Sequence, residues 1–238
     1  IFFQKYSQMS RSQQGLAGAG EWETLRKLLP DFKDKRVLDL GCGYGWHCIY
    51  AMEHGASSVV GVDISHKMLE VAKEKTHFPQ VEYKCCAIED VEFPEESFDV
   101  ILSSLAFHYV ADYEILVKKI YRILKSGGNL VFTVEHPVFT AYGTQDWYYN
   151  KKGEILHFPV DNYYYEGKRT AVFLGEKVTK YHRTLTTYLN TLLSNGFIIN
   201  HIVEPQPPEY MMDIPGMQDE MRRPMMLIVS ANKNCYTT

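Results

Sequence analysis

A glycine-rich segment followed by an acidic residue could bind a nucleotide. The segment 39–45 (DLGCGYG) lies between a short apolar run and an amphipathic stretch that continues to about His54. Glycines at such a junction let the backbone turn tightly and approach a ligand, with amide groups of the following helix directed towards it. Asp63 ends the next apolar run, 18 residues after Gly45. A carboxylate there can accept both hydroxyl groups of an adenosine ribose.

Two details of this segment separate the candidate cofactors. A dinucleotide fingerprint needs G-x-G-x-x-G, and counting from Gly41 places Trp46 where the third glycine should be. Asp39 comes directly before the loop, where its charge would repel a pyrophosphate but suit a cationic ligand such as S-adenosylmethionine. An NAD-dependent oxidoreductase is therefore disfavoured. The alternative without any nucleotide is a plain turn in which Asp39 caps the helix.

A second group of residues could move a proton. His108 follows one predicted strand, Glu135 and His136 end the next, and a later segment could bring in His182. The carboxyl ends of parallel strands meet at one edge of a sheet, where ligands bind in open α/β folds. Any of the four could be a general base if the substrate atom must lose a proton. The structural alternatives are an ion pair of Glu135 with Arg183, or a histidine that caps a loop.

These residues must be positioned by alternating strands and helices. Short β-branched runs alternate with amphipathic stretches from Lys35 to Asn129, a pattern that predicts a parallel sheet covered by helices on both faces. The later part adds two more strands. The predicted strands are 36–40, 58–62, 81–84, 98–103, 130–134, 197–204 and 225–230.

The predicted helices are defined by caps and apolar spacing. Ser65 is a plausible N-cap, and the Gly127-Gly128 pair is expected to end the helix that begins near Asp112. Between Pro137 and Arg183 no clean period appears. The predicted helices are 21–29, 45–54, 65–75, 112–126 and 184–195.

Four segments resemble motifs of the class I S-adenosylmethionine-dependent methyltransferases. They are 37–45 (VLDLGCGYG), 60–65 (VGVDIS), 97–108 (SFDVILSSLAFH) and 124–128 (LKSGG). Within that family the chain is most similar to the small-molecule group that includes ubiquinone- and biotin-pathway methyltransferases. The resemblance covers residues 36–137 firmly and the rest loosely. It implies a Rossmann-like, doubly wound, mostly parallel seven-stranded sheet, with S-adenosylmethionine as cofactor and S-adenosylhomocysteine as product.

The resemblance also implies residue roles. Gly41 and Gly43 would give room for the methionine moiety, Asp63 would hold the ribose, and Ile64 and Met68 would flank the adenine. Ala87 stands where the family has an acidic residue, so Glu89 or a main-chain carbonyl would replace that contact, and Ile88 would keep its backbone donor. Arg11, placed by position alone, could meet the cofactor carboxylate. The full cofactor-binding prediction is Arg11, Asp39, Gly41, Cys42, Gly43, Asp63, Ile64, Met68, Ala87, Ile88, Glu89, Ser103 and Ser104.

One domain with an insertion accounts for the whole chain. We expect residues 1–35 to form an N-terminal cap, 36–136 the cofactor-binding core, 137–184 a lid over the substrate, and 185–238 the rest of the sheet. The lid is rich in aromatic residues that could stack on a planar substrate or build their own small core. They are Tyr142, Trp147, Tyr148, Tyr149, Tyr163, Tyr164, Tyr165 and Tyr181.

Composition and charge disfavour several kinds of partner and of cellular compartment. The 238 residues are 45% hydrophobic, and 25 basic against 29 acidic side chains leave a net charge of −4, which disfavours nucleic-acid and membrane partners. The basic pairs 151–152 and 168–169 look like solvated loop charges. Five cysteines without a C-x-x-C pair predict a cytoplasmic protein with no metal site. No apolar run reaches the roughly 18 residues of a membrane span, and the missing initiator Met suggests residues before Ile1.

The leading hypothesis is therefore methyl transfer from S-adenosylmethionine to O, N or C of a small molecule, by a monomer or homodimer. The alternatives are a protein or nucleic-acid methyltransferase and a non-catalytic S-adenosylmethionine-binding sensor. The first alternative is disfavoured because the chain lacks a basic surface and the N-P-P-Y or Pro-Cys motifs of base-modifying enzymes. The second would keep the cofactor pocket without turnover.

Overall fold

The computed structural model describes residues 2–235 and is built on a central seven-stranded sheet. The strand order is β10-β11-β5-β4-β1-β2-β3, with β11 antiparallel to its two neighbours and the other pairs parallel. This confirms the predicted Rossmann-like, mostly parallel sheet. The seven strands are β1 Arg36–Leu40, β2 Ser58–Asp63, β3 Val81–Cys85, β4 Phe98–Ser104, β5 Leu124–Glu135, β10 Phe197–Val203 and β11 Met226–Lys233.

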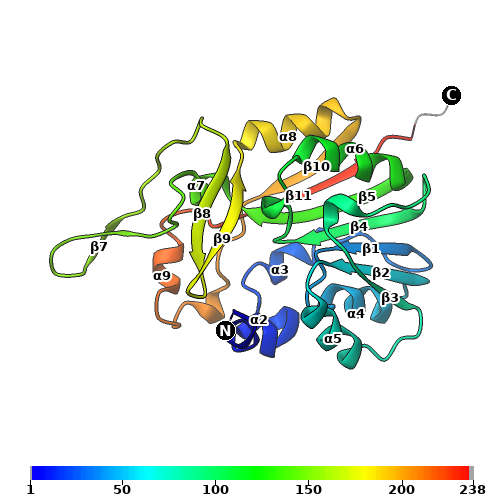
Figure 1. Cartoon of the computed structure of the whole chain (residues 1–238), viewed down its shortest axis with the longest axis horizontal. Coiled ribbons are helices and arrows are strands. Elements are labelled where there is room, and N and C mark those ends of the chain that lie inside the picture. The colour runs from blue at the N-terminus through cyan, green and yellow to red at the C-terminus, as the bar shows by residue number, and fades with distance from the viewer. Residues whose placement is uncertain (1, 236–238) are drawn as a thin grey trace.

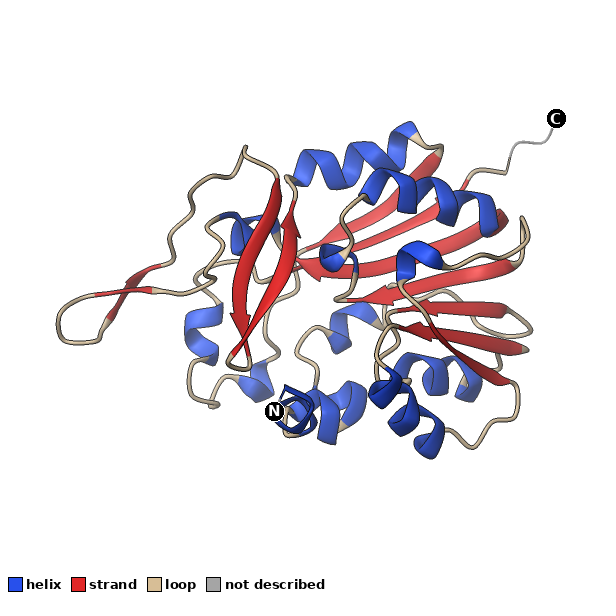
Figure 2. Ribbon diagram, in the orientation of Figure 1, coloured by secondary structure: helices blue, strands red, loops and turns tan. Residues whose placement is uncertain are grey.

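Helices cover the sheet on both faces (Figures 1 and 2). Neighbouring strand residues point to opposite faces, so Val37 packs in the cluster that includes helices α3, α4 and α5, and Leu38 packs in the cluster under α6 and α8. Burial on both faces explains why these strands read as continuous apolar runs. The five helices are α3 Trp22–Leu25, α4 Trp46–Glu53, α5 His66–Lys75, α6 Tyr113–Ile123 and α8 Leu185–Ser194.

Side-chain caps set where these helices begin. The carboxylate of Asp112 accepts the Ile115 amide at 2.9 Å, and the hydroxyl of Thr184 accepts the Thr187 amide at 3.1 Å. The prediction that α6 continues to Gly127-Gly128 is wrong. Leu124 already has an extended backbone and starts β5, and the glycine pair lies where the pairing of β5 with β4 changes register.

The N-terminal segment is less regular than predicted. Instead of a helix over 21–29, α3 covers only four residues, and three short elements precede it. Across residues 2–235, no helix is both long enough and apolar enough to cross a membrane. The short elements are α1 Phe2–Ser7, α2 Ser10–Gln13 and the 3-10 helix η1 Gly15–Gly18.

The insertion after β5 contains regular structure that its sequence pattern did not predict. Strands β8 and β9 form a hairpin that stands beside the carboxyl edge of the sheet, and β6 and β7 form a second arm that projects from the body (Figure 1). The hairpin turns at Leu174 and Gly175, both with positive φ. The pair 168–169, predicted as loop charges, therefore lies on a strand. The elements are α7 Pro137–Ala141, β6 Tyr148–Tyr149, β7 Ile155–His157, β8 Gly167–Phe173 and β9 Glu176–His182.

The turn between β1 and α4 is fixed by glycines that have no room for a side chain. Gly45 has a φ of 75°, and a Cβ there would lie 2.2 Å from the Tyr83 hydroxyl. That hydroxyl is itself bonded to Thr76 at 2.7 Å, so the ring is held in place. The turn therefore depends on glycine for its backbone angle and for its packing.

A matched pair of substitutions separates these two effects. Gly153 has a φ of 80°, but a Cβ there would have no neighbouring atom within 4 Å, so Gly153→Ala should cost only the left-handed backbone penalty of about 1–2 kcal/mol. Gly45→Ala should cost about 3 kcal/mol or more, because overpacking adds to that penalty. Urea unfolding measures both, and equal losses would mean that Tyr83 moves aside freely.

Candidate functional site

A large cavity lies at the carboxyl edge of the sheet, where the strand order reverses between β1 and β4. Its volume is about 1050 Å³, at the upper end of the roughly 300–1,000 Å³ of small-molecule sites. Loops after β1 to β5, the N-terminal segment and residues 205–226 line this larger cavity. The predicted cofactor-binding residues that line it are Arg11, Gly41, Gly43, Asp63, Ile64, Met68, Ala87, Ile88, Glu89 and Ser104.

Asp63 holds the end of β2 against the glycine turn. One carboxylate oxygen accepts the Gly43 amide at 2.9 Å and the other accepts the Ser65 amide at 2.8 Å. Burial raises the pKa of Asp63, although these two hydrogen bonds oppose the shift. A Cβ on Gly41 would lie 2.4 Å from that of Ala106. Only glycine therefore lets the backbone form this wall of the cavity.

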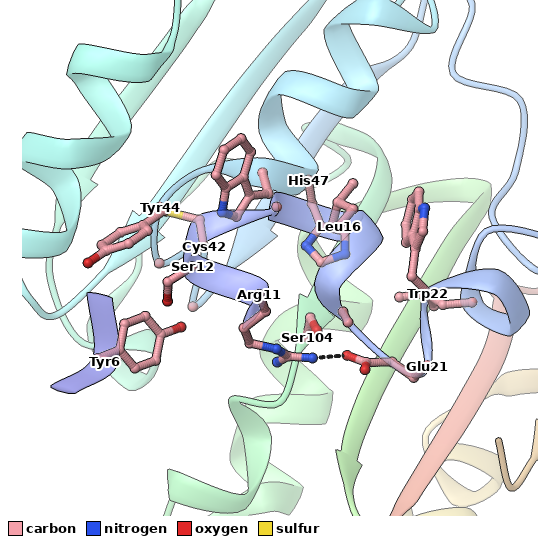
Figure 3. Close-up of a pocket in the computed structure, with 16 residues that line it drawn as sticks. Tyr6, Arg11, Ser12, Leu16, Glu21, Trp22, Cys42, Tyr44, His47 and Ser104 are labelled. Atoms are coloured by element: carbon pink, nitrogen blue, oxygen red, sulfur yellow. Dashed lines mark hydrogen bonds and ion pairs between the residues drawn. The ribbon is translucent and has the colours of Figure 1, made fainter. Parts of the chain in front are cut away.

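A smaller cavity of about 70 Å³ separates the N-terminal segment from the same turn (Figure 3). Cys42 lines it, and Arg11 reaches across it to form an ion pair with Glu21. Three buried polar atoms around it have no partner among residues 2–235. They are Ser12 Oγ, Glu21 Oε2 and Trp46 Nε1.

Asp39 lies beneath the turn and lines neither cavity. Its side chain is buried, one oxygen accepts the Cys48 thiol at 3.4 Å, and Oδ1 has no partner within the described chain. Burial, reinforced by the charge of Asp63, raises the pKa of Asp39 to about 7. Ser103 is also buried below the surface, where its hydroxyl bonds to the Leu40 carbonyl at 2.8 Å. The unpartnered carboxylate oxygen of Glu21, which lines both cavities, fits a cofactor with positive charge.

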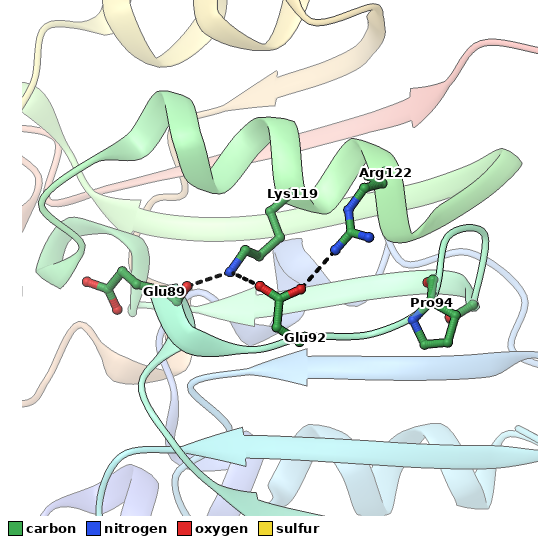
Figure 4. Close-up of polar contacts among 6 residues, drawn as sticks. Glu89, Glu92, Pro94, Lys119 and Arg122 are labelled. Atoms are coloured by element: carbon green, nitrogen blue, oxygen red, sulfur yellow. Dashed lines mark hydrogen bonds and ion pairs between the residues drawn. The ribbon is translucent and has the colours of Figure 1, made fainter.

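The segment that follows β3 (Ala87–Asp90) is held from outside the cavity (Figure 4). Lys119 of α6 donates to the Glu89 carbonyl at 2.6 Å and lies 3.0 Å from the Glu92 carboxylate. Arg122 bonds to the same Glu92 at 3.1 Å. These contacts fix the backbone of Glu89, whose residue lines the cavity.

Glu135, at the end of β5, also lines the larger cavity. Lys180, itself buried, donates to Glu135 at 2.6 Å and to the Gln145 amide oxygen at 2.8 Å, and Gln145 donates to the second Glu135 oxygen at 2.6 Å. Burial opposes ionisation, but His108, Lys180 and these hydrogen bonds hold the pKa of Glu135 below its ordinary value. The expected alternative, a pair of Glu135 with Arg183, is wrong because Lys180 takes that position.

His108 lies beside Glu135 and also lines the larger cavity. Its Nδ1 accepts the backbone amide of Glu135 at 3.3 Å, so the neutral ring carries its proton on Nε2. Burial lowers the pKa of His108 to about 4 despite the nearby Glu135. At neutral pH the side chain is therefore an uncharged hydrogen-bond donor.

The other two candidate bases lie away from both cavities. His136 caps α7 by accepting the Val138 amide at 3.0 Å, and its Nε2 is 2.8 Å from Glu204. His182 bonds to the Thr140 hydroxyl at 2.7 Å and to the Tyr163 carbonyl at 2.9 Å. His136 therefore has a capping role like the one that the structural alternative described, whereas His182 joins two segments of the insertion.

Arg183 connects the insertion to the loop after β4. This buried guanidinium donates to the carbonyls of Val110, of Ala111 at 3.0 Å and of Phe107 at 3.4 Å. Phe107–Tyr109 form the 3-10 helix η3, which carries His108. The end of β9 thus supports the residues that line the cavity.

The aromatic residues predicted to form a lid over the substrate lie elsewhere. None of the eight named above lines the larger cavity, and Phe173 is the described residue of the insertion that does. Tyr148, Tyr149, Tyr164 and Tyr165 are exposed. Trp147 instead joins Phe139 and Phe158 around the Arg223 guanidinium, which is 4.6–5.1 Å from the three ring centres. Because these three rings pack around one guanidinium, they form a small core of the insertion itself.

Sequence reasoning missed several residues of the site. Lys180 gave no local signal, because its partner Glu135 is 45 residues away. Tyr109 and Phe173 also line the cavity. One signal was present in the composition, since six of the nine methionines fall within residues 211–226.

Comparisons with known proteins agree with this geometry. Residues 38–132 match the family described as Methyltransferase domain. A Listeria monocytogenes protein assigned to the S-adenosylmethionine-dependent methyltransferases is 58% identical, with a TM-score of 0.89 over 92% of this chain and 99% of its own. An S-adenosylmethionine-dependent methyltransferase from Mesorhizobium loti is 40% identical, with a TM-score of 0.85 over 92% of this chain and 100% of its own.

A ubiquinone biosynthesis O-methyltransferase from Coxiella burnetii is similar over a shorter region. It is 35% identical over 112 residues, which cover 46% of this chain and 47% of that enzyme. This chain therefore matches about half the length of that enzyme.

The buried Asp39 predicts a pH dependence of stability. The pKa of Asp39 is about 7 in the folded protein and near 3.9 in the unfolded chain. Its contribution to the free energy of unfolding is therefore fully present below about pH 4 and is lost as the pH rises through 7. Wild-type protein should lose about 2 kcal/mol relative to Asp39→Asn between about pH 5 and 7. Urea unfolding of both proteins across this range measures the difference, and parallel curves would contradict the prediction.

Proposed function

This chain belongs to the S-adenosylmethionine-dependent methyltransferases, and we propose that it methylates a small molecule bound in the larger cavity. The observation that carries the proposal is the continuity of that cavity. One end is formed by the glycine turn, Asp63 and residues 87–90, and the other extends past Glu135 to residues 205–226. A cofactor and a second molecule can therefore lie in contact within one site.

Asp63 and the glycine turn hold the cofactor in this proposal. Asp63 accepts the ribose hydroxyls with the lone pairs left after bonding to Gly43 and Ser65. Ile64 and Met68 contact the adenine, and Glu89 stands near its amino group. Arg11 and Glu21, already paired, offer a cation and a carboxylate to the charged amino-acid end.

The cofactor, when bound, supplies an electrophilic methyl group on a positively charged sulfur that leaves as a neutral thioether. The protein then has to align the substrate atom, a contribution of at most about 7–11 kcal/mol. His108 donates a hydrogen bond and Glu135 accepts one, so together they can orient a substrate O–H or N–H group. In this arrangement Glu135, rather than a histidine, receives the substrate proton when one must be lost.

The depth of His108 and Glu135 favours a small substrate over a macromolecule. His108 is buried and the Glu135 side chain is only 12% exposed, so a side chain on another protein or a base in a nucleic acid would need a long reach to meet them. The similarity to a ubiquinone O-methyltransferase supports the same class of substrate. The insertion supports this end of the site through Lys180 and Arg183.

Removal of the Asp63 carboxylate tests the cofactor site. Asp63→Ala loses the acceptor for two hydroxyl groups and two backbone amides, so S-adenosylhomocysteine should bind at least about 100-fold more weakly. Titration calorimetry measures the affinity, and Asp161→Ala, an exposed aspartate of the insertion, should bind like wild type. Retained affinity in a folded Asp63→Ala protein would disprove the assigned role.

A turnover screen tests the reaction itself. Purified protein with methyl-labelled S-adenosylmethionine should transfer label to an organic-soluble member of a metabolite library, and His108→Ala and Glu135→Gln should slow this transfer more than they weaken S-adenosylhomocysteine binding. Label transfer to protein or nucleic acid alone would contradict the small-molecule proposal.

A further inference from the structure

The part of the larger cavity beyond Glu135 has an apolar wall of methionines. This methionine wall consists of Met9, Met211, Met217, Met225 and Met226. Most of it comes from the connection between β10 and β11, with Met226 as the first residue of β11 and paired in register with Glu135. Methionine side chains are flexible and polarisable, so such a wall adapts to varied apolar shapes.

The charged residues around this part of the cavity leave no cation for an anionic substrate. Arg11 is the one lysine or arginine among the described residues that line the cavity, and the proposed function assigns it, with its partner Glu21, to the charged amino-acid end of the cofactor. Glu220 lines the cavity, but its partner Arg223 lies behind it and donates to both its oxygens at 2.7 and 3.0 Å. A carboxylate or phosphate brought here would lose its hydration and meet mainly acidic side chains.

The polar end of the same space offers one acceptor and one donor. Lys180 and Gln145 each use one lone pair of a different Glu135 oxygen, and an ionised carboxylate has about four such positions. His108 contributes an Nε2–H group, because its Nδ1 is already bonded. A single N–H or O–H group can therefore be bound here while the rest of the molecule lies on apolar surface.

We propose that the substrate is an apolar small molecule, neutral or cationic, whose N–H or O–H group bonds to Glu135 while its hydrocarbon or aromatic body lies against the methionine wall. This inference rests on the proposed function, because it concerns the substrate half of the same cavity. It excludes substrates that carry a carboxylate or phosphate next to the methionine wall.

Three probes of one shape test the charge preference. 4-Phenylbutylamine, 4-phenylbutan-1-ol and 4-phenylbutanoate differ at one end only, and each is titrated by calorimetry into protein saturated with S-adenosylhomocysteine near neutral pH. The amine and the alcohol should bind at least about 10-fold more tightly than the carboxylate, a difference of about 1.4 kcal/mol. Equal or tighter binding of the carboxylate, or no binding of any probe, would overturn the proposal.

A charge placed in the methionine wall tests the location. Met217→Lys should strengthen binding of 4-phenylbutanoate at least about 10-fold and weaken binding of the amine. Met221→Lys is the matched control, because Met221 lies four residues away, is exposed and does not line the cavity. If the Met217→Lys and Met221→Lys variants bound the probes with the same affinities, the probes would not lie against the methionine wall.

The outcome for the proposed function can be separated from these results. Failure of wild-type protein to bind S-adenosylhomocysteine would contradict the cofactor site, and the probes would then be titrated alone to judge the methionine wall. Normal S-adenosylhomocysteine binding without charge discrimination among the probes would overturn only the substrate class.

Discussion

Between β1 and α4 the backbone turns through glycines whose Cβ positions are already filled by neighbouring residues, by Ala106 at Gly41 and by the Tyr83 hydroxyl at Gly45. Asp63 bonds to the amide of Gly43 in this turn, so the end of β2 is fixed relative to the end of β1. The strand order reverses beside this point, which opens the sheet edge to a ligand. The lining segments that follow β1, β2 and β4 are packed against this turn.

The other half of the cavity depends on buried cations that do not face it. Lys180 bonds to Glu135, Arg183 to the carbonyls around η3, and Arg223 to Glu220 and three aromatic rings. A buried ion pair stabilises a particular geometry only when its remaining hydrogen bonds are satisfied, and Gln145 completes that requirement at Glu135. The insertion thus holds residues that line the cavity through side chains that do not line it themselves.

The sequence predicted those site residues that directly follow a strand along the chain. The glycine turn, Asp63 and the segment after β3 each follow a predicted strand directly, so strand order alone placed them at one edge. Lys180 could not be predicted, because a buried lysine is rare and its partner is distant in sequence. The α6 boundary was misplaced because a Gly-Gly pair stops a helix and also permits a change of strand register, and only the pairing with β4 decides between them.

The sequence left two interpretations of the eight aromatic residues open for a related reason. Their density indicated an apolar cluster, but the sequence does not show whether that cluster faces a ligand or a neighbouring arginine. Methionine clustering in residues 211–226 carried the more useful information about the cavity.

The connection from β10 to β11 begins and ends at the carboxyl edge, because β11 runs antiparallel to its neighbours. Its residues 204–225 carry most of the methionine wall, yet they take no part in strand register. If the substrate lies in the cavity as proposed, substitutions or insertions in this connection would alter which molecule is accepted without changing the strand pairing of the sheet. Under the proposed function, the antiparallel strand therefore places the substrate-facing connection outside the strand pairing, so specificity can change through this one stretch of chain.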